Sequence, residues 1–114
     1  MPLAQLLDRL IELLEAHRSP RLDWLRETAA LLDRDPEAFW ARLNSAAFWG
    51  GAHSIANEAL ADNPGLDPLL WQMQIREFRE LMLELAEIQR SRGDSYPDIE
   101  FWIAAYDNWN QAGI

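Results

Sequence analysis

Leucines recur every three or four residues at the start of the chain, with charged residues between them. The apolar positions are Leu3, Leu6, Leu7, Leu10 and Leu14, and the acids Asp8, Glu12 and Glu15 fall elsewhere on a helical projection. This spacing places the leucines on one face of a helix that begins after Pro2. Ile11 and Leu13 widen the apolar face, so we expect this helix either to be well buried or to contact a second chain.

Two proline steps divide the next part of the chain. Ser19-Pro20 and Asp35-Pro36 each place a good N-cap residue directly before a proline, which fits the first helical position. They predict helices over residues 20–35 and 36–48. In the second of these helices, the expected buried residues are Phe39, Leu43 and Ala47.

Adjacent glycines, Gly50 and Gly51, interrupt the pattern before a short helix expected from Ser54 to Leu60. After a turn at residues 63–65, the longest predicted helix starts at Pro68, with Asp67 as its N-cap, and ends near Arg90. Its expected buried face is Leu70, Met73, Phe78, Leu81, Leu85 and Ile88.

The segment Ser95–Asp98 resembles a capping box and predicts a last helix that ends near Gln111. Leucine and alanine abound, whereas β-branched residues are limited to seven isoleucines and one threonine, a composition that favours helices over sheets. No repeat or linker divides the chain. We therefore expect an all-α fold, a compact single-domain bundle of five or six helices over residues 1–114.

Several classes of chemistry are excluded or disfavoured by composition. The chain has no cysteine, which rules out disulfides and thiolate metal sites, and no four-ligand metal pattern is present. We expect no cofactor and no metal. No apolar stretch is long enough to cross a membrane, and the first residues lack the features of a secretory signal, so a cytoplasmic location is expected.

The net charge of −9 is spread unevenly. Residues 43–75 carry three acids and no base, and residues 93–114 carry four acids and no base; these acids are Glu58, Asp62, Asp67, Asp94, Asp98, Glu100 and Asp107. Such segments repel nucleic-acid phosphates and attract a basic protein. Trp71 and Trp109 lie among these acids and are the expected aromatic anchors of a protein interface.

The corner "GGAHSIAN" collects the residues that most resemble a site: Gly50, Gly51, His53, Ser54 and Asn57. A serine nucleophile needs a base aimed at its hydroxyl, and neighbouring residues seldom provide that geometry. Glycines before a helix can hold an anion, but the sequence supplies no lysine or arginine nearby. Simpler roles are a chain turn at the glycines and an N-cap at Ser54. We expect the protein not to be an enzyme.

The same stretch, Gly50-Gly51-Ala52-His53-Ser54-Ile55-Ala56-Asn57, resembles the GG-Met-GS-Leu-Asn-Asp signature of a family of small bacterial helical proteins of unknown function. This chain departs from the signature at His53, where the family has glycine, and at Asn57, where it has aspartate. The resemblance implies a helical fold with the signature at mid-chain, and it implies no activity.

In size and charge the chain is also similar to bacterial immunity proteins, which are small acidic helical domains that neutralise toxins. Our leading hypothesis is therefore an acidic domain that sequesters a basic protein partner, as an immunity or antitoxin-like inhibitor does. Its expected contacts are Glu58, Asp62, Asp67, Trp71, Asp98, Glu100, Asp107 and Trp109. The alternatives are a homodimer formed through the first helix, and a small-ligand sensor at the Gly50–Asn57 corner.

Overall fold

A computed structural model describes residues 2–58, 67–93 and 95–114. These residues form helices and no strand, which confirms the all-α prediction. The helices are α1 (Leu3–Ala16), α2 (Leu22–Arg34), α3 (Pro36–Leu43), α4 (Ala46–Trp49), α5 (Ile55–Glu58), α6 (Pro68–Arg92) and α7 (Ile99–Ala112). A bilayer-spanning helix needs about 20 apolar residues, and none of the described helices provides such a stretch.

Both aspartate caps are confirmed. The Asp35 side chain accepts a hydrogen bond from the Ala38 amide, and the Asp67 side chain accepts from the Leu69 and Leu70 amides. Each aspartate therefore pairs backbone N–H groups that the first helical turn leaves free. At the other end of α6, Gly93 adopts a left-handed conformation at φ +82° and ends the helix after Arg92, two residues beyond the predicted end near Arg90.

The two serine caps are wrong. Ser19 accepts from the Arg21 amide within a turn, and this turn delays the start of α2 to Leu22. Ser95 lies outside α7, which begins at Ile99. The Ile99 amide donates to the Tyr96 carbonyl and so closes a turn just before the helix. In both places a tight turn uses the residues that the sequence pattern assigns to the first turn of the helix.

The helix expected over residues 36–48 is two helices, α3 and α4. This division explains why the described residues form seven helices rather than the five or six expected. The Ser45 hydroxyl donates to the Arg42 carbonyl at 2.5 Å, and Ser45 itself is extended, so the helix ends at Leu43. After this break Phe48 and Trp49 are buried, whereas Ala47 is only half-buried, contrary to the prediction.

On α6 the predicted face is correct in the middle and wrong at the start. Phe78, Leu81 and Leu85 are buried, but Leu70 and Met73 are 43% and 63% exposed. The fully buried residues of α6 begin at Ile75, and in the two turns before it only Trp71 among the large apolar side chains packs against the core. These two turns leave the other large apolar side chains on the surface.

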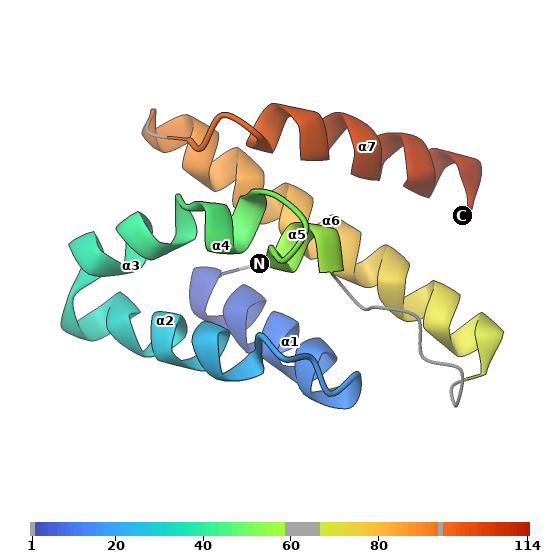
Figure 1. Ribbon diagram of the computed structural model, residues 1–114, viewed down its shortest axis with the longest axis horizontal. Coiled ribbons are helices and arrows are strands. Elements are labelled where there is room, and N and C mark those ends of the chain that lie inside the picture. Colours follow the sequence, from blue (N-terminus) through green and yellow to red (C-terminus); the bar gives the residue numbers. More distant parts are fainter. Residues whose placement is uncertain (1, 59–66, 94) are drawn as a thin grey trace.

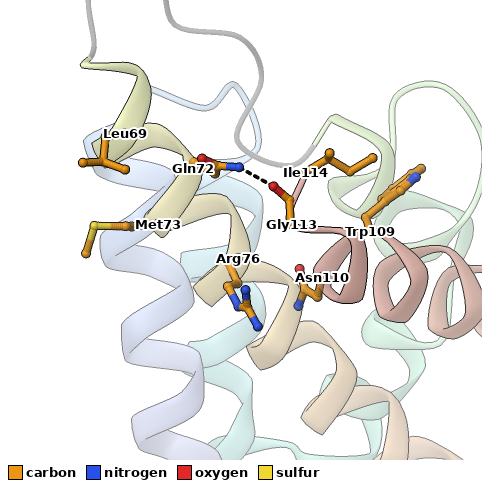
Figure 2. A pocket seen from close by; sticks show the side chains of 8 residues that line it. All are labelled: Leu69, Gln72, Met73, Arg76, Trp109, Asn110, Gly113 and Ile114. Atoms are coloured by element: carbon orange, nitrogen blue, oxygen red, sulfur yellow. Dashed lines mark hydrogen bonds between the residues drawn. The ribbon is translucent and has the colours of Figure 1, made fainter.

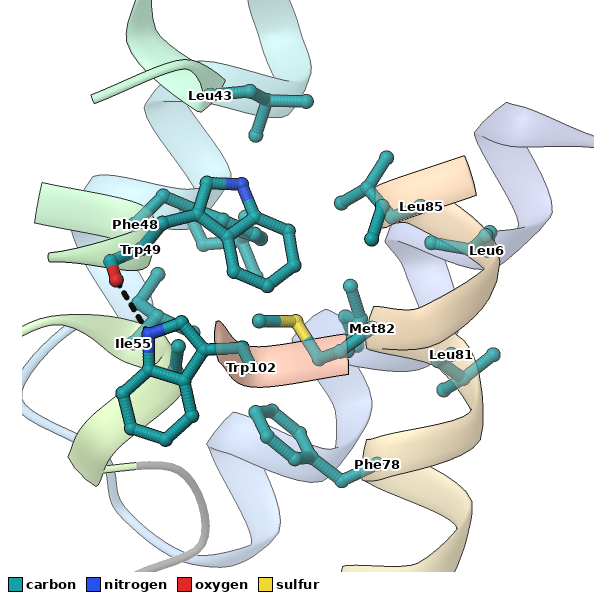
Figure 3. Close-up of a cluster of buried hydrophobic side chains, with 14 of the residues drawn as sticks. Leu6, Leu43, Phe48, Trp49, Ile55, Phe78, Leu81, Met82, Leu85 and Trp102 are labelled. Atoms are coloured by element: carbon teal, nitrogen blue, oxygen red, sulfur yellow. Dashed lines mark hydrogen bonds between the residues drawn. The ribbon is translucent and has the colours of Figure 1, made fainter. Parts of the chain in front are cut away.

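One buried cluster receives side chains from all seven helices. Helix α1 packs between α2 and α6, α7 runs along α6, and the short helices α4 and α5 lie at the centre of the view in Figure 1. Figure 3 shows Met82 between the side chains of Trp49 and Phe78, with Trp102 beside them. Buried hydrogen bonds from Trp102 to the Trp49 carbonyl and from Tyr106 to the Ala56 carbonyl attach α7 to α4 and α5.

The leucines of α1 are part of this cluster. Leu6, Leu7, Leu10, Leu13 and Leu14 are at most 1% exposed, which confirms a well-buried first helix. The apolar face that suggested a homodimer through this helix is thus covered by other helices of the same chain.

Candidate functional site around Trp109

The two glycines of the mid-chain corner have different roles. Gly51 has φ +59°, a left-handed conformation that favours glycine, and nothing lies near the position of a side chain. Gly50 is extended and buried, and a Cβ there would lie 2.9 Å from both the Ala46 Cα and the Tyr96 hydroxyl. One glycine therefore turns the chain, and the other permits close packing of the α4 backbone against Tyr96.

Ser54 is held as a structural residue. Its buried hydroxyl donates to the Gly51 carbonyl at 3.0 Å and accepts from the Asn57 amide at 3.1 Å, which makes it the N-cap of α5. The His53 ring points elsewhere, with Nδ1 3.3 Å from a Glu58 carboxylate oxygen and most of its side chain exposed. The described hydrogen bonds of Ser54 thus include no base that could activate it.

Tertiary packing brings Arg21 to this corner, which the sequence could not show. Its Nε donates to the His53 carbonyl at 2.8 Å, so α5 is tied to the turn before α2. Asn57 donates to the Ala52 carbonyl at 3.0 Å and stabilises the turn from its other side. Within the described ranges, no group of three or more histidines and carboxylates is arranged to hold a metal ion.

The corner forms one wall of a surface hollow of about 450 Å³. Its lining residues are Gly51, Asn57, Asp98, Phe101, Trp102 and Trp109. The structure therefore brings together four predicted site residues: Gly51 and Asn57 from the corner, Asp98 directly before α7, and Trp109 on α7. We call this space the Asp98 hollow.

Figure 2 shows a second hollow, of about 290 Å³, between the start of α6 and the end of α7. Leu69, Gln72, Met73 and Arg76 line it from α6, and Trp109, Asn110, Gly113 and Ile114 line it from the other side. Gln72 donates to the Gly113 carbonyl and joins the two sides. We call this space the α6–α7 groove.

A third hollow, lined by Trp71, Gln72, Arg79, Trp109 and Ile114, adjoins the groove. Trp109 therefore lines all three hollows, and it is 37% exposed. The Arg79 guanidinium lies 5.1 Å from the centre of the Trp109 ring and donates to the Ile114 carbonyl, which braces the tryptophan from the protein side. Burial lowers the pKa of Arg79, and burial also raises the pKa of the neighbouring Tyr106 hydroxyl.

The large apolar side chains exposed among the described residues gather at these hollows. They are Leu69, Leu70, Met73, Phe101, Trp109 and Ile114, and all except Leu70 line the Asp98 hollow or the α6–α7 groove. Sequence reasoning missed Leu69, Phe101 and Ile114, and it assigned Met73 to the core. Only the packing of α7 on α6 reveals that these residues meet.

The predicted acidic contacts do not form one surface. At about 100° per residue, Glu100 and Asp107 project from the side of α7 opposite to Asp98 and Trp109. Glu100 pairs with Arg90 at 3.0 Å, which corrects the expectation of an acid without a basic partner. Glu58 contacts His53, and Asp67 caps α6. Asp62 and Asp94 lie outside the described residues.

Comparison with known protein families, curated proteins and solved structures gives no match for this chain. The resemblance of residues 50–57 to a family signature and the similarity to immunity proteins therefore stay predictions. The functional argument rests on the geometry around Trp109.

Proposed function

We propose that this protein is a protein-binding domain that sequesters a basic protein partner on the surface around Trp109. The gathering of exposed apolar side chains at the α6–α7 groove and the Asp98 hollow carries the proposal. Scattered apolar residues are ordinary on a protein surface, whereas a contiguous group in a concave region is typical of an interaction site.

Trp109 would be the centre of this interface. It borders every hollow described here and is already braced by Arg79, so little side-chain entropy is lost when a partner covers it. Tryptophans surrounded by apolar neighbours account for much of the binding energy in many protein interfaces. Leu69 and Met73 would extend the contact along α6.

Charge favours a basic partner. The net charge is −9, and Asp98 lies within the surface itself. Asp107, on the other side of α7, would act at longer range by attracting the partner rather than by touching it, whereas the charge of Glu100 is already offset by Arg90. An inhibitor of the immunity or antitoxin kind is the specific form of this function that chain length and charge favour.

The experiment is affinity capture from source-cell lysate, followed by titration of the captured protein after purification. We expect a basic protein that binds the wild-type chain and loses at least about 10-fold in affinity to the variant Leu69→Ser, Met73→Ser. Both side chains are more than 60% exposed, so the variant should fold normally. Leu70→Ser is the matched control, since Leu70 lines none of the three hollows, and it should retain binding.

Equal binding of the double variant and the wild-type chain would refute the proposal, as would capture of acidic proteins only. Sedimentation equilibrium of the same proteins addresses the alternative of self-association. A wild-type dimer that the double variant disrupts would assign the apolar surface to a second copy of this chain rather than to a foreign protein.

A further inference from the structure

The aromatic walls of the Asp98 hollow are held in position from behind. Trp102 donates from its indole N–H to the Trp49 carbonyl at 2.6 Å, which sets the plane of its ring. Phe101 meets Trp102 nearly edge-on, with ring centres 5.0 Å apart and an angle of 80°. The buried Tyr106 lies against Trp102 and Trp109, at 5.4 and 6.1 Å between ring centres. The rings therefore form walls in different planes before any ligand binds.

Small residues leave space between these walls. Trp102 and Trp109 are two turns apart on α7. The residues between them on that side of the helix are Tyr106, which is buried and donates to the Ala56 carbonyl, and Ala105, whose side chain is only a methyl group. Gly51 contributes backbone from the opposite side, where nothing occupies the position of a Cβ. The resulting space of about 450 Å³ is large enough for the head group of a long side chain.

The charge of the lining selects a cation. Asp98 supplies a carboxylate and Asn57 a neutral amide, and the six lining residues include no lysine, arginine or histidine. The α7 helix begins beside Asp98, yet the Asp98 side chain makes no capping bond to it. A carboxylate beside three aromatic rings attracts a cation through both its charge and the negative ring faces.

Among cations, a guanidinium fits this lining better than an ammonium. It is planar, so it can stack on a tryptophan ring while it donates two parallel hydrogen bonds to one carboxylate. The fold itself uses the stacking contact repeatedly: arginine lies over tryptophan in the pairs Arg42–Trp24, Arg79–Trp109 and Arg92–Trp40, at 4.1–5.1 Å from the ring centres. Arg79 does not line the Asp98 hollow.

We infer that the Asp98 hollow is a recognition pocket for an arginine side chain of the partner protein. The guanidinium would stack on the tryptophan rings that line the hollow, Trp102 and Trp109, and pair with the Asp98 carboxylate. Phe101 would close the outer side. The inference deepens the proposed function and rests on it for the source of the arginine. It also assigns a role to the Gly51–Asn57 corner, which supplies a wall of the pocket.

The test is an NMR titration of the ¹⁵N-labelled full chain with N-acetyl-arginine amide, with the indole N–H signals of Trp102 and Trp109 as reporters. We expect saturable shifts of both signals, binding of N-acetyl-lysine amide at least about 3-fold weaker, and none by the neutral N-acetyl-citrulline amide. Asp98→Asn and Phe101→Leu should each weaken arginine binding at least about 5-fold. Asp107→Asn removes the same charge from the other side of α7 and should change the affinity for the arginine probe less than about 2-fold.

Absence of saturable shifts, equal response to citrulline, or equal effects of Asp98→Asn and Asp107→Asn would overturn the inference. Unchanged backbone spectra of the free variants would show that each remains folded. The result of this titration can be distinguished from the result of the partner-capture experiment. If the partner is captured and the arginine probe does not bind, only the pocket assignment fails. If the probe binds but no basic protein is captured, the pocket stands and the proposed partner class fails.

Discussion

The indole N–H of Trp102 donates to the backbone carbonyl of Trp49 at 2.6 Å, and both residues are buried (Figure 3). Trp49 is the last residue of α4, so its carbonyl has no partner within its own short helix. A side chain of α7 therefore supplies the hydrogen-bond donor that the last carbonyl of α4 lacks within its own helix. It also connects the core to the Asp98 hollow, because the same Trp102 ring lines that hollow.

Replacement of Trp102 by phenylalanine should destabilise the fold by about 1–3 kcal/mol, since the buried Trp49 carbonyl is left without its donor. The measurement is urea unfolding followed by far-UV circular dichroism. Trp40→Phe is the control, because Trp40 is only half-buried. Equal losses in the two variants would show that ring size, rather than the hydrogen bond, sets the cost.

The two adjacent glycines should respond differently to substitution. Gly50→Ala should cost about 1–3 kcal/mol of unfolding free energy, because its Cβ would meet the Ala46 backbone at 2.9 Å. Gly51→Ala should cost about 1–2 kcal/mol through backbone strain alone. Asparagine tolerates the left-handed conformation, so Gly51→Asn should recover part of that loss whereas Gly50→Asn should not. Thermal unfolding of the four variants tests this pattern.

Trp49 and Gln89 form a buried polar pair, and its contribution to folding stability requires both side chains. The Trp49 indole donates to Gln89 Oε1 at 2.9 Å, while Gln89 Nε2 has no partner among the described residues. Gln89→Leu should destabilise the fold, because it leaves the indole N–H unpaired. In a double-mutant cycle with Trp49→Phe, we expect a coupling energy of about 1–2 kcal/mol in urea unfolding. Additive effects would show that the hydrogen bond contributes nothing measurable.

The ion pair of Arg9 and Glu77 should make stability depend on pH. Arg9 donates twice, at 2.6 and 2.7 Å, and these bonds lower the pKa of Glu77. A lowered pKa in the folded state means that the contribution is present at neutral pH and is lost as the pH falls below about 4. Its size should be at most about 1 kcal/mol, because the side chains are 36% and 38% exposed.

Glu77→Gln should therefore be less stable than the wild-type chain at pH 7, and the difference should shrink as the pH falls through the lowered pKa of Glu77. Urea unfolding at a series of pH values from 7 downward is the measurement. Glu80→Gln serves as the control, since Glu80 contacts Arg76 through one 3.5 Å pair on a more exposed surface. A difference between wild type and Glu77→Gln that stays constant with pH would contradict the assignment.

Helix content and most helix positions could be predicted because their causes are local. Leucine spacing predicts α1, and the Asp-Pro steps at residues 35–36 and 67–68 place the starts of α3 and α6 correctly. Ser19 and Ser95 misled the prediction because turns of a few residues compete with capping for the same side chains. The break at Ser45 was missed because the apolar spacing of Phe39, Leu43 and Ala47 outweighed the adjacent Asn44 and Ser45, two residues that favour helix ends.

The candidate site could be predicted only in fragments. Asp98, Trp109, Gly51 and Asn57 stand out in the sequence for separate reasons, but their meeting in one hollow depends on how α5 packs beside α7. Leu69 and Met73 carry no sequence signal, because the same residues would be core if α6 were covered along its whole length. Ile114 lies after α7, and only the packing of α7 on α6 places it in the groove.

The sequence by itself determined that the chain is helical, that its first helix has a wide apolar face and that its net charge is acidic, since side-chain spacing, capping and charge act over a few residues. Only the tertiary structure decided which acids are paired, which aromatic rings stay exposed and which segments form the hollows around Trp109. Those properties arise from contacts between different helices, such as Glu100 of α7 with Arg90 of α6, or Trp102 with Trp49, which lies 53 residues earlier in the sequence. No local pattern encodes contacts of this kind.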